Sequence, residues 1–240
     1  MTGRMTGTGS FERLDVAPVR EMVGQLETRI ATRFPERGLR KVAGDLVQMA
    51  DEVADNALET QRRLRLVQTV ARASIVLIVV ATIVVLLVAL KDAVQHDELA
   101  SFEWVPLIES IINDLVFAAI AVFFLYALPG RMARERLLAQ LHRLRSLAHI
   151  VDMHQLTKDP ERLRPGFRST HDSVDPHLDR DDLERYLDYC SELLSLIGKV
   201  AALCAEESQD AVVLDTVSTI ETLTTSMSRK IWQKISLLPD

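Results

Sequence analysis

The sequence predicts an all-α membrane protein, in which a two-span transmembrane hairpin is joined to long cytoplasmic helices that form a coiled coil or helical bundle. Two observations lead to this prediction. Residues 73–130 of the 240-residue chain hold two long apolar segments and a single lysine, whereas the regions before and after them hold twelve and fifteen basic residues. Elsewhere apolar residues recur at spacings of three and four, which is typical of helices, and no strand-like alternation competes.

Residues 73–90 are predicted to form the first transmembrane helix. These eighteen residues carry no charge, and Ser74 and Thr82 are their only polar members. They span roughly 27 Å as a helix, close to the thickness of a hydrocarbon core. Some seventy residues precede the segment, many of them charged, so we expect an internal anchor rather than a cleaved signal peptide.

Residues 105–128 are predicted to form the second transmembrane helix, after an external connector at 91–104. Its apolar run is pure only over residues 115–128, which span roughly 21 Å as a helix. Pro129 and Gly130 predict the end of this helix, and a separate juxtamembrane helix is expected over residues 129–156.

The distribution of basic residues predicts the orientation. Within about twenty residues of the two spans, nine arginines lie on the outer flanks, whereas the connector holds only Lys91. Both termini are therefore predicted in the cytoplasm, and the helices rich in Arg, Ala and Leu favour a bacterial inner membrane. The same charges are candidate contacts for anionic lipid headgroups: Arg62, Arg63, Arg65, Arg72, Arg131, Arg134 and Arg136.

Residues 1–72 are expected to form N-terminal cytoplasmic helices and a stalk. No proline occurs between Pro35 and Pro106, so one helix is expected to run from about Leu39 into the first span. The expected apolar stripe of this stalk is Leu39, Val42, Leu46, Met49 and Val53, and that of the shorter helix before it is Val19, Val23, Leu26 and Ile30.

The C-terminal region is predicted to contain a flexible linker at residues 157–180, which hold three prolines and few apolar residues. Residues 181–238 then predict either a helical hairpin or one long helix. The seam predicted for its first part is Leu183, Leu187, Cys190, Leu194, Ile197, Ala201 and Cys204. Both thiols lie about four turns apart on one predicted helix, which excludes a disulfide between them. The apolar seams close within the chain or against neighbouring copies, and the sequence leaves both arrangements open.

Four polar residues of the predicted spans are candidate intramembrane sites: Glu109, Asn113, Asp114 and Thr82. Carboxylates inside a membrane are costly, and those that occur there are usually functional. One interpretation is a helix start at the membrane interface, where the helix N-terminus favours a carboxylate. The other is a ring of acids at the outer mouth of an oligomeric pore.

The hairpin, the cytoplasmic helices and the acids at the start of the second span resemble the architecture of the mitochondrial calcium uniporter family. The motif of that family is Trp-Asp-apolar-Met-Glu-Pro. In this chain the residues from Trp104 to Glu109 read Trp-Val-Pro-Leu-Ile-Glu, so the first Asp, the Met and the final Pro of the motif are absent. The resemblance therefore covers the architecture and one Trp/Glu pair, and it implies no ion selectivity.

Metal and catalytic motifs are sparse. His149 and Asp152 lie one turn apart and are the only weak candidates for metal ligands, and no cofactor is expected. The chain has no glycine-rich phosphate loop and no His-Glu-x-x-His spacing, and nothing places a Ser-His-Asp triad, so an enzyme is not predicted. Neither flank has a large basic excess, which argues against a nucleic-acid partner.

The function predicted from these observations is a membrane-anchored, homo-oligomeric helical scaffold or partner-binding protein with a cytoplasmic bundle, whose partners are the lipid bilayer, other copies of the chain and, as a further candidate, a cytoplasmic protein. The alternative is a cation-conducting pore or membrane-disrupting effector with acidic residues at its outer mouth.

Overall fold

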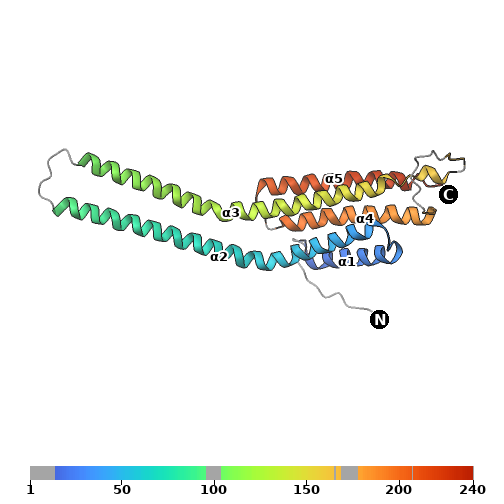
Figure 1. Ribbon diagram of the computed structural model, residues 1–240, viewed down its shortest axis with the longest axis horizontal. Coiled ribbons are helices and arrows are strands. Elements are labelled where there is room, and N and C mark those ends of the chain that lie inside the picture. Colours follow the sequence, from blue (N-terminus) through green and yellow to red (C-terminus); the bar gives the residue numbers. More distant parts are fainter. Residues whose placement is uncertain (1–13, 96–103, 165, 169–177, 207, 240) are drawn as a thin grey trace, which may run out of the picture. The chain divides into compact units, whose positions relative to one another are not determined.

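The computed structural model describes residues 14–95, 104–164, 166–168, 178–206 and 208–239, of which 55–65, 86, 89–90, 92–95 and 104–107 are described by their backbone alone. All regular structure in these residues is helical, which confirms the predicted all-α class. The helices are α1 (Val16–Arg33), α2 (Gly38–Gln95), α3 (Trp104–Leu156), the short 3-10 helix η1 (Pro160–Leu163), α4 (Arg180–Ala205) and α5 (Ala211–Ile235) (Figure 1).

The chain divides into two compact units. The first, which we call the bundle unit, comprises Met1–Ala57 and Arg136–Asp240, and the second, the hairpin unit, comprises Leu58–Glu135. Helices α2 and α3 each contribute to both units, whereas α1, η1, α4 and α5 belong to the bundle unit alone.

Two long helices differ in how well the sequence predicted their ends. Helix α2 is unbroken from Gly38 to Gln95, as the absence of proline predicted. The prediction that Pro129 and Gly130 end a helix was wrong, because α3 continues through them to Leu156. A proline inside a helix removes one hydrogen bond and costs about 3 kcal/mol. Leucine- and arginine-rich sequence continues the helix directly after Gly130, and these residues have high helix propensity.

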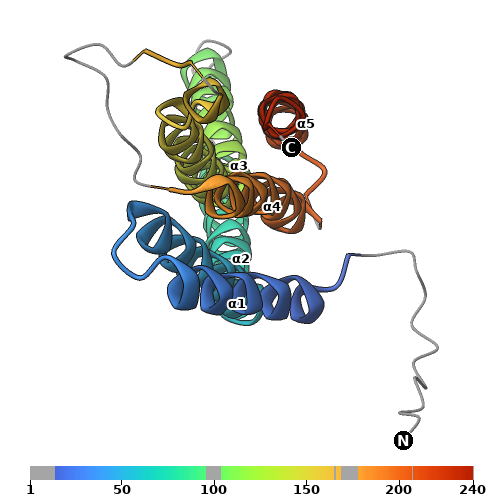
Figure 2. The same ribbon diagram turned by 90° about the vertical axis from the view of Figure 1, so that its right-hand side faces the viewer.

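Helix α4 is the central helix of the bundle unit. Sixteen of its 26 residues are buried, whereas α1 buries a single stripe of four residues. Both views show α4 between α1 and α5 (Figure 1, Figure 2). A helix that is apolar on most of its circumference is stable in water only when other helices surround it. The predicted seam through Cys190 and Cys204 is therefore one of several buried faces of α4.

The C-terminal region forms two helices rather than one. Helix α4 ends at Ala205 and α5 begins at Ala211, with Asp210 as its N-cap. One carboxylate oxygen of Asp210 accepts hydrogen bonds from the backbone N–H groups of Val212 (3.0 Å) and Val213 (3.2 Å). The aspartate satisfies two N–H groups that the first turn of a helix would otherwise leave without an acceptor.

The apolar stripes of all five α-helices meet in one core. Leu26 of α1, Leu46 of α2, Leu144 of α3, Leu194 of α4 and Ile220 of α5 are buried in a single apolar cluster. Each seam is thus covered by another helix of the same chain, and none of them requires a neighbouring copy. Of the two arrangements that the sequence left open, the bundle unit shows closure within one chain.

Ion pairs tie α1 to the central helix. The guanidinium group of Arg29 binds the Glu192 carboxylate through two bonds of 2.9 and 2.6 Å, and Arg33 Nε lies 3.0 Å from an Asp182 oxygen. The Arg29 guanidinium also lies 5.1 Å from the centre of the Tyr189 ring. Further pairs join α1 to α2 (Arg20–Asp51) and α2 to α3 (Glu52–Arg143, 2.6 Å). All of these pairs lie at the surface, where each contributes about 0 to 1 kcal/mol.

The start of the predicted linker packs on the bundle. Residues 157–164 contain η1, and both Lys158 and Pro160 are buried. Residues 169–177 of the predicted linker lie outside the described part of the chain.

Candidate membrane-interaction surface

Large apolar side chains are exposed in the hairpin unit, whereas similar side chains are buried in the bundle unit. In its part of α2, Leu77 is 70% exposed, whereas Leu46 in the bundle part of the same helix is 0% exposed. In its part of α3, Phe117 is 65% exposed. Further exposed residues of this kind are Leu66, Val70, Val76, Val80, Ile83, Val84, Val85, Leu87 and Val88 on α2 and Ile112, Leu115, Ile120, Phe123 and Phe124 on α3.

Each long helix contains a segment that is long and apolar enough to cross a membrane. The segment of α2 is Leu66–Val85, and that of α3 begins at Ile108. Almost none of either segment is buried, so neither resembles the core helix of a soluble protein. Removal of one Val, Leu or Phe side chain from water is favourable by about 1.5 to 3 kcal/mol. Transfer of all the exposed apolar side chains from water to an apolar solvent would therefore be favourable by tens of kcal/mol.

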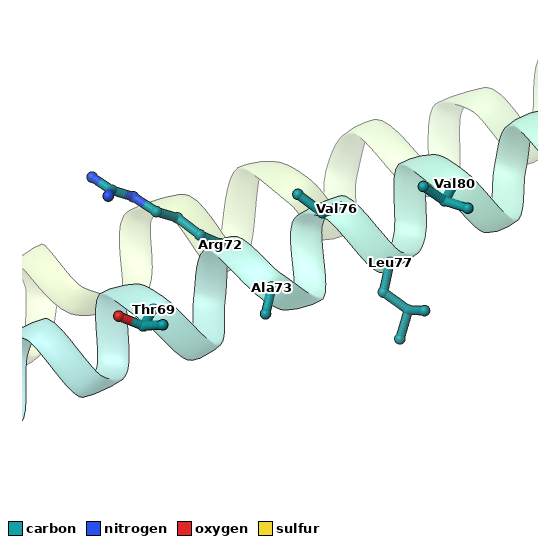
Figure 3. Close-up of a pocket in the computed structure, with 6 residues that line it drawn as sticks. All are labelled: Thr69, Arg72, Ala73, Val76, Leu77 and Val80. Carbon is teal, nitrogen blue, oxygen red and sulfur yellow. The ribbon is translucent and has the colours of Figure 1, made fainter.

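A shallow groove of about 520 Å³ runs along α2 in the hairpin unit. It is lined by Thr69, Arg72, Ala73, Val76, Leu77 and Val80 (Figure 3). These residues form two rows at spacing four, the first from Arg72 through Val76 to Val80 and the second from Thr69 through Ala73 to Leu77. Rows of this spacing are the ridges of a helix surface, and the groove lies between them. The exposed lining is almost wholly apolar, and Thr69 and Arg72 contribute to it mainly through carbon atoms.

The arginines that were predicted to contact lipid headgroups differ in where the structure places them. Arg72 lines the groove, and Arg131, Arg134 and Arg136 are exposed on α3. The side chains of Arg62, Arg63 and Arg65 lie outside the described residues. The sequence pointed to Arg72 by its charge. The sequence did not distinguish its apolar groove partners Ala73, Val76, Leu77 and Val80 from the other residues of the uncharged run at 73–90.

The predicted intramembrane polar residues are not gathered at one point by any contact among the described side chains. Glu109, Asn113 and Asp114 are exposed on α3. The Thr82 hydroxyl donates a hydrogen bond of 2.8 Å to the backbone carbonyl of Ile78, four residues earlier in the same helix. A threonine hydroxyl in an apolar helix commonly has such a partner, so Thr82 needs no ligand to explain it.

The weak metal candidates are not joined by a third ligand. His149 is exposed, and Asp152 accepts a hydrogen bond of 2.8 Å from the Gln155 amide. Within the described ranges, no three His, Cys, Asp or Glu side chains lie close enough to hold a metal ion. His154 has a packing role instead, because a Cβ atom on Gly38 would lie 2.5 Å from its imidazole ring.

A polar cluster that sequence reasoning missed lies where α3 ends in the bundle unit. The Lys234 ammonium group donates to the backbone carbonyls of Gln155 (2.8 Å) and Lys158 (3.2 Å), so α5 caps the end of α3. The Lys158 ammonium group lies 5.3 Å from the centre of the Tyr186 ring. Burial lowers the pKa of both lysines, and a lysine late in α5 was the only sequence signal for this cap.

The two thiols are core residues. Cys190 and Cys204 are free and buried on α4, which confirms that they share one helix without a disulfide. Burial raises the pKa of each thiol to about 12. The reactive thiolate is therefore disfavoured at neutral pH, and both residues behave as small apolar side chains.

Comparisons with known proteins gave no match: no family model, no curated protein and no solved structure is significantly similar to this chain.

Proposed function

We propose that this protein is a membrane-anchored helical scaffold, with the hairpin unit inserted in the bilayer and the bundle unit in the cytoplasm. The observation that carries this proposal is the contrast between the two units. The bundle unit covers the main apolar stripes of its helices with one another, whereas the hairpin unit leaves an apolar surface exposed on both of its helices. Lipid tails would cover that surface without exposing backbone groups, because the hydrogen bonds of a helix are internal.

The orientation follows from the basic residues. Nine arginines lie either shortly before the first span or shortly after the second. The connector between the spans, at residues 91–104, holds only Lys91 as a basic residue. Basic flanks remain on the cytoplasmic side of a bacterial inner membrane, so both termini lie in the cytoplasm and the connector lies outside.

The bundle unit serves as the partner-binding module in this proposal, and the protein is not an enzyme. Ile150, Met153 and Leu156 of α3 are exposed apolar residues at spacing three on one helix. Scattered apolar residues are normal on a surface, but a row on one helix is a suitable contact for another helix. A second copy of the chain is one such partner, and the mass of the protein in detergent would show it.

Two measurements test the proposal. After cell lysis, the full chain should stay in the membrane fraction in alkaline carbonate and leave it only in detergent. A reporter that is active only outside the cytoplasm should work when inserted between Gln95 and His96 and should fail when fused after Asp240. Recovery of the chain in the aqueous fraction would refute the anchor, and the reverse reporter pattern would refute the orientation.

The second candidate function is a cation pore. Glu109 and Asp114 favour it, because both carboxylates are exposed on α3, within or beside the apolar segment that begins at Ile108. In liposomes, a pore would show cation flux that Glu109→Gln or Asp114→Asn reduces while insertion is unchanged. Absence of flux from the wild-type protein at every pH and potential would refute the pore and leave the scaffold as the proposed function. A monomer in detergent would also exclude a pore built from several copies.

A further inference from the structure

We infer that the groove on α2 binds one anionic phospholipid, whose phosphate contacts Arg72 and whose acyl chain lies along Ala73, Val76, Leu77 and Val80. This inference rests on the proposed membrane location. It adds a specific lipid site to that location, which the exposed apolar surface alone does not provide.

The groove and the Arg72 side chain together match an amphiphile. The exposed lining is almost wholly apolar, and the Arg72 guanidinium group extends away from it at the Thr69 end (Figure 3). Arg72 is also the last charged residue before the uncharged run at 73–90, so the proposed topology places it at the level of the headgroups. A lipid with its phosphate at this guanidinium group and its acyl chain in the apolar groove would match the change from headgroup to tail in the bilayer.

Arg72 differs from the arginines of the bundle unit. Arg29, Arg33 and Arg143 each bind a carboxylate of a neighbouring helix. Arg72 is exposed and has no ion pair among the described residues. A guanidinium group is well suited to a phosphate because it donates two parallel hydrogen bonds. The cytoplasmic leaflet, where the proposed topology places Arg72, is rich in anionic lipid.

The shape of the groove favours an acyl chain as the occupant. Ala73 is the smallest lining residue, and it precedes the larger Leu77 in the second row. A flexible acyl chain can follow such a shallow depression. A second helix would instead bring side chains against the exposed guanidinium group and would need an acid to pair with it. The charge at one end thus decides between a lipid and a helix.

The test uses the full-length protein in nanodiscs of phosphatidylcholine, with or without phosphatidylglycerol, followed by native mass spectrometry of the lipids it retains. The wild-type chain should retain one phosphatidylglycerol and no phosphatidylcholine. Arg72→Gln should weaken phosphatidylglycerol binding about tenfold or more, the size expected for a charge-assisted hydrogen bond. Val76→Phe should also weaken binding, because the ring fills the groove and leaves the charge in place.

Matched variants separate a site from general attraction. Arg131→Gln removes one exposed charge of the hairpin unit that does not line the groove, and it should weaken phosphatidylglycerol binding much less than Arg72→Gln. Val79→Phe adds the same ring outside the lining and should leave the retained lipid unchanged. Equal weakening by Arg72→Gln and Arg131→Gln would overturn the inference in favour of diffuse electrostatics. Equal retention of phosphatidylcholine would also overturn it. Circular dichroism of each variant confirms that helicity is unchanged.

Three further outcomes are distinguishable. A dimer mass that Val76→Phe abolishes, without retained lipid, would assign the groove to a second copy and refute the lipid. Recovery of the chain in the aqueous fraction would refute the membrane proposal itself. Detergent-dependent extraction with no retained lipid would refute only the lipid site.

Discussion

The two parts of α2 contain similar residues in different patterns. In the bundle unit, Leu39, Leu46 and Met49 lie on one stripe of the helix and are buried. In the hairpin unit, Val76 and Leu77 belong to a run that is apolar on all sides, and they are exposed. One helix thus shows that apolar content does not determine burial. An apolar stripe indicates that the helix packs against other helices on one side. A helix that is apolar on all sides is instead surrounded either by protein or by lipid.

The largest expected effect comes from charges placed in the bundle core. Replacement of Leu194 and Ile197 by Asp would bury two unpaired carboxylates in the central helix, at a cost of several kcal/mol each. That cost is comparable to the whole free energy of unfolding of a small domain, about 5 to 15 kcal/mol. The full-length variant should lose the cooperative thermal transition of the bundle, measured by circular dichroism in detergent.

A matched pair of substitutions controls for charge itself. Val212 and Leu214 are exposed residues of α5, and their replacement by Asp should leave the transition close to wild type. If both double variants melted alike, the seam of α4 would not be buried in solution.

The same leucine-to-alanine truncation at two positions tests the comparison within α2 directly. Leu46→Ala should lower the free energy of unfolding of the bundle by about 2 to 5 kcal/mol, because it leaves a cavity. Leu77→Ala removes the same atoms from an exposed position and should change that free energy by less than about 0.5 kcal/mol. Near-UV circular dichroism of the packed Tyr186 and Tyr189 reports the bundle in both variants. Equal losses would contradict the division of α2 between two environments.

The sequence predicted the stripes of the bundle unit well, since a stripe depends only on local spacing. Every predicted stripe residue of α1 is buried, from Val19 to Ile30, and so are Leu183, Leu187 and Leu194 of α4. Spacing did not show that α4 is central. Tyr186, Tyr189, Leu193, Leu196, Val200 and Leu203 lie off the predicted seam and are buried as well. Those faces are covered by other helices, with α5 and α1 among them, and a heptad describes only one seam.

The candidate site was predictable only in part, for a similar reason. The charge of Arg72 and its place before an uncharged run were visible in the sequence. The groove depends on which side chains of this run lie side by side on the helix surface, and charge alone does not show that. The cap on α3 required Lys234 to lie beside carbonyl groups almost eighty residues earlier in the chain. The helix end predicted at Pro129 was wrong, because local helix propensity on both sides outweighed one lost hydrogen bond.

A smaller effect is expected from acid, and it should be confined to the bundle unit. Burial, with a smaller contribution from the charge of Lys158, lowers the pKa of the half-buried His154. The unfolded chain therefore binds a proton more readily than the folded one, and stability rises with pH in this range. The contribution of neutral His154 is present above the unfolded pKa of about 6.5 and is lost as the pH falls through the lower folded value.

His154→Gln should reduce this pH dependence, which chemical unfolding at about pH 5 and about pH 8 would measure. His149→Gln changes an exposed imidazole on the same helix and should retain the wild-type dependence. A dependence unchanged in both variants would assign the acid response to other groups.

The smallest effect concerns the surface arginines, and it contrasts the two units most directly. Arg29→Gln removes a two-bond contact with Glu192 and a contact with the Tyr189 ring, so it should lower bundle stability by about 0.5 to 1 kcal/mol. High salt should reduce the difference, because exposed ion pairs are screened. A double-mutant cycle with Glu192→Gln isolates the pair. Arg72→Gln removes the same group from a position without a protein partner among the described residues, so the bundle transition should not move. A comparable loss there would make Arg72 part of the fold, and its guanidinium group would no longer be available to a lipid phosphate.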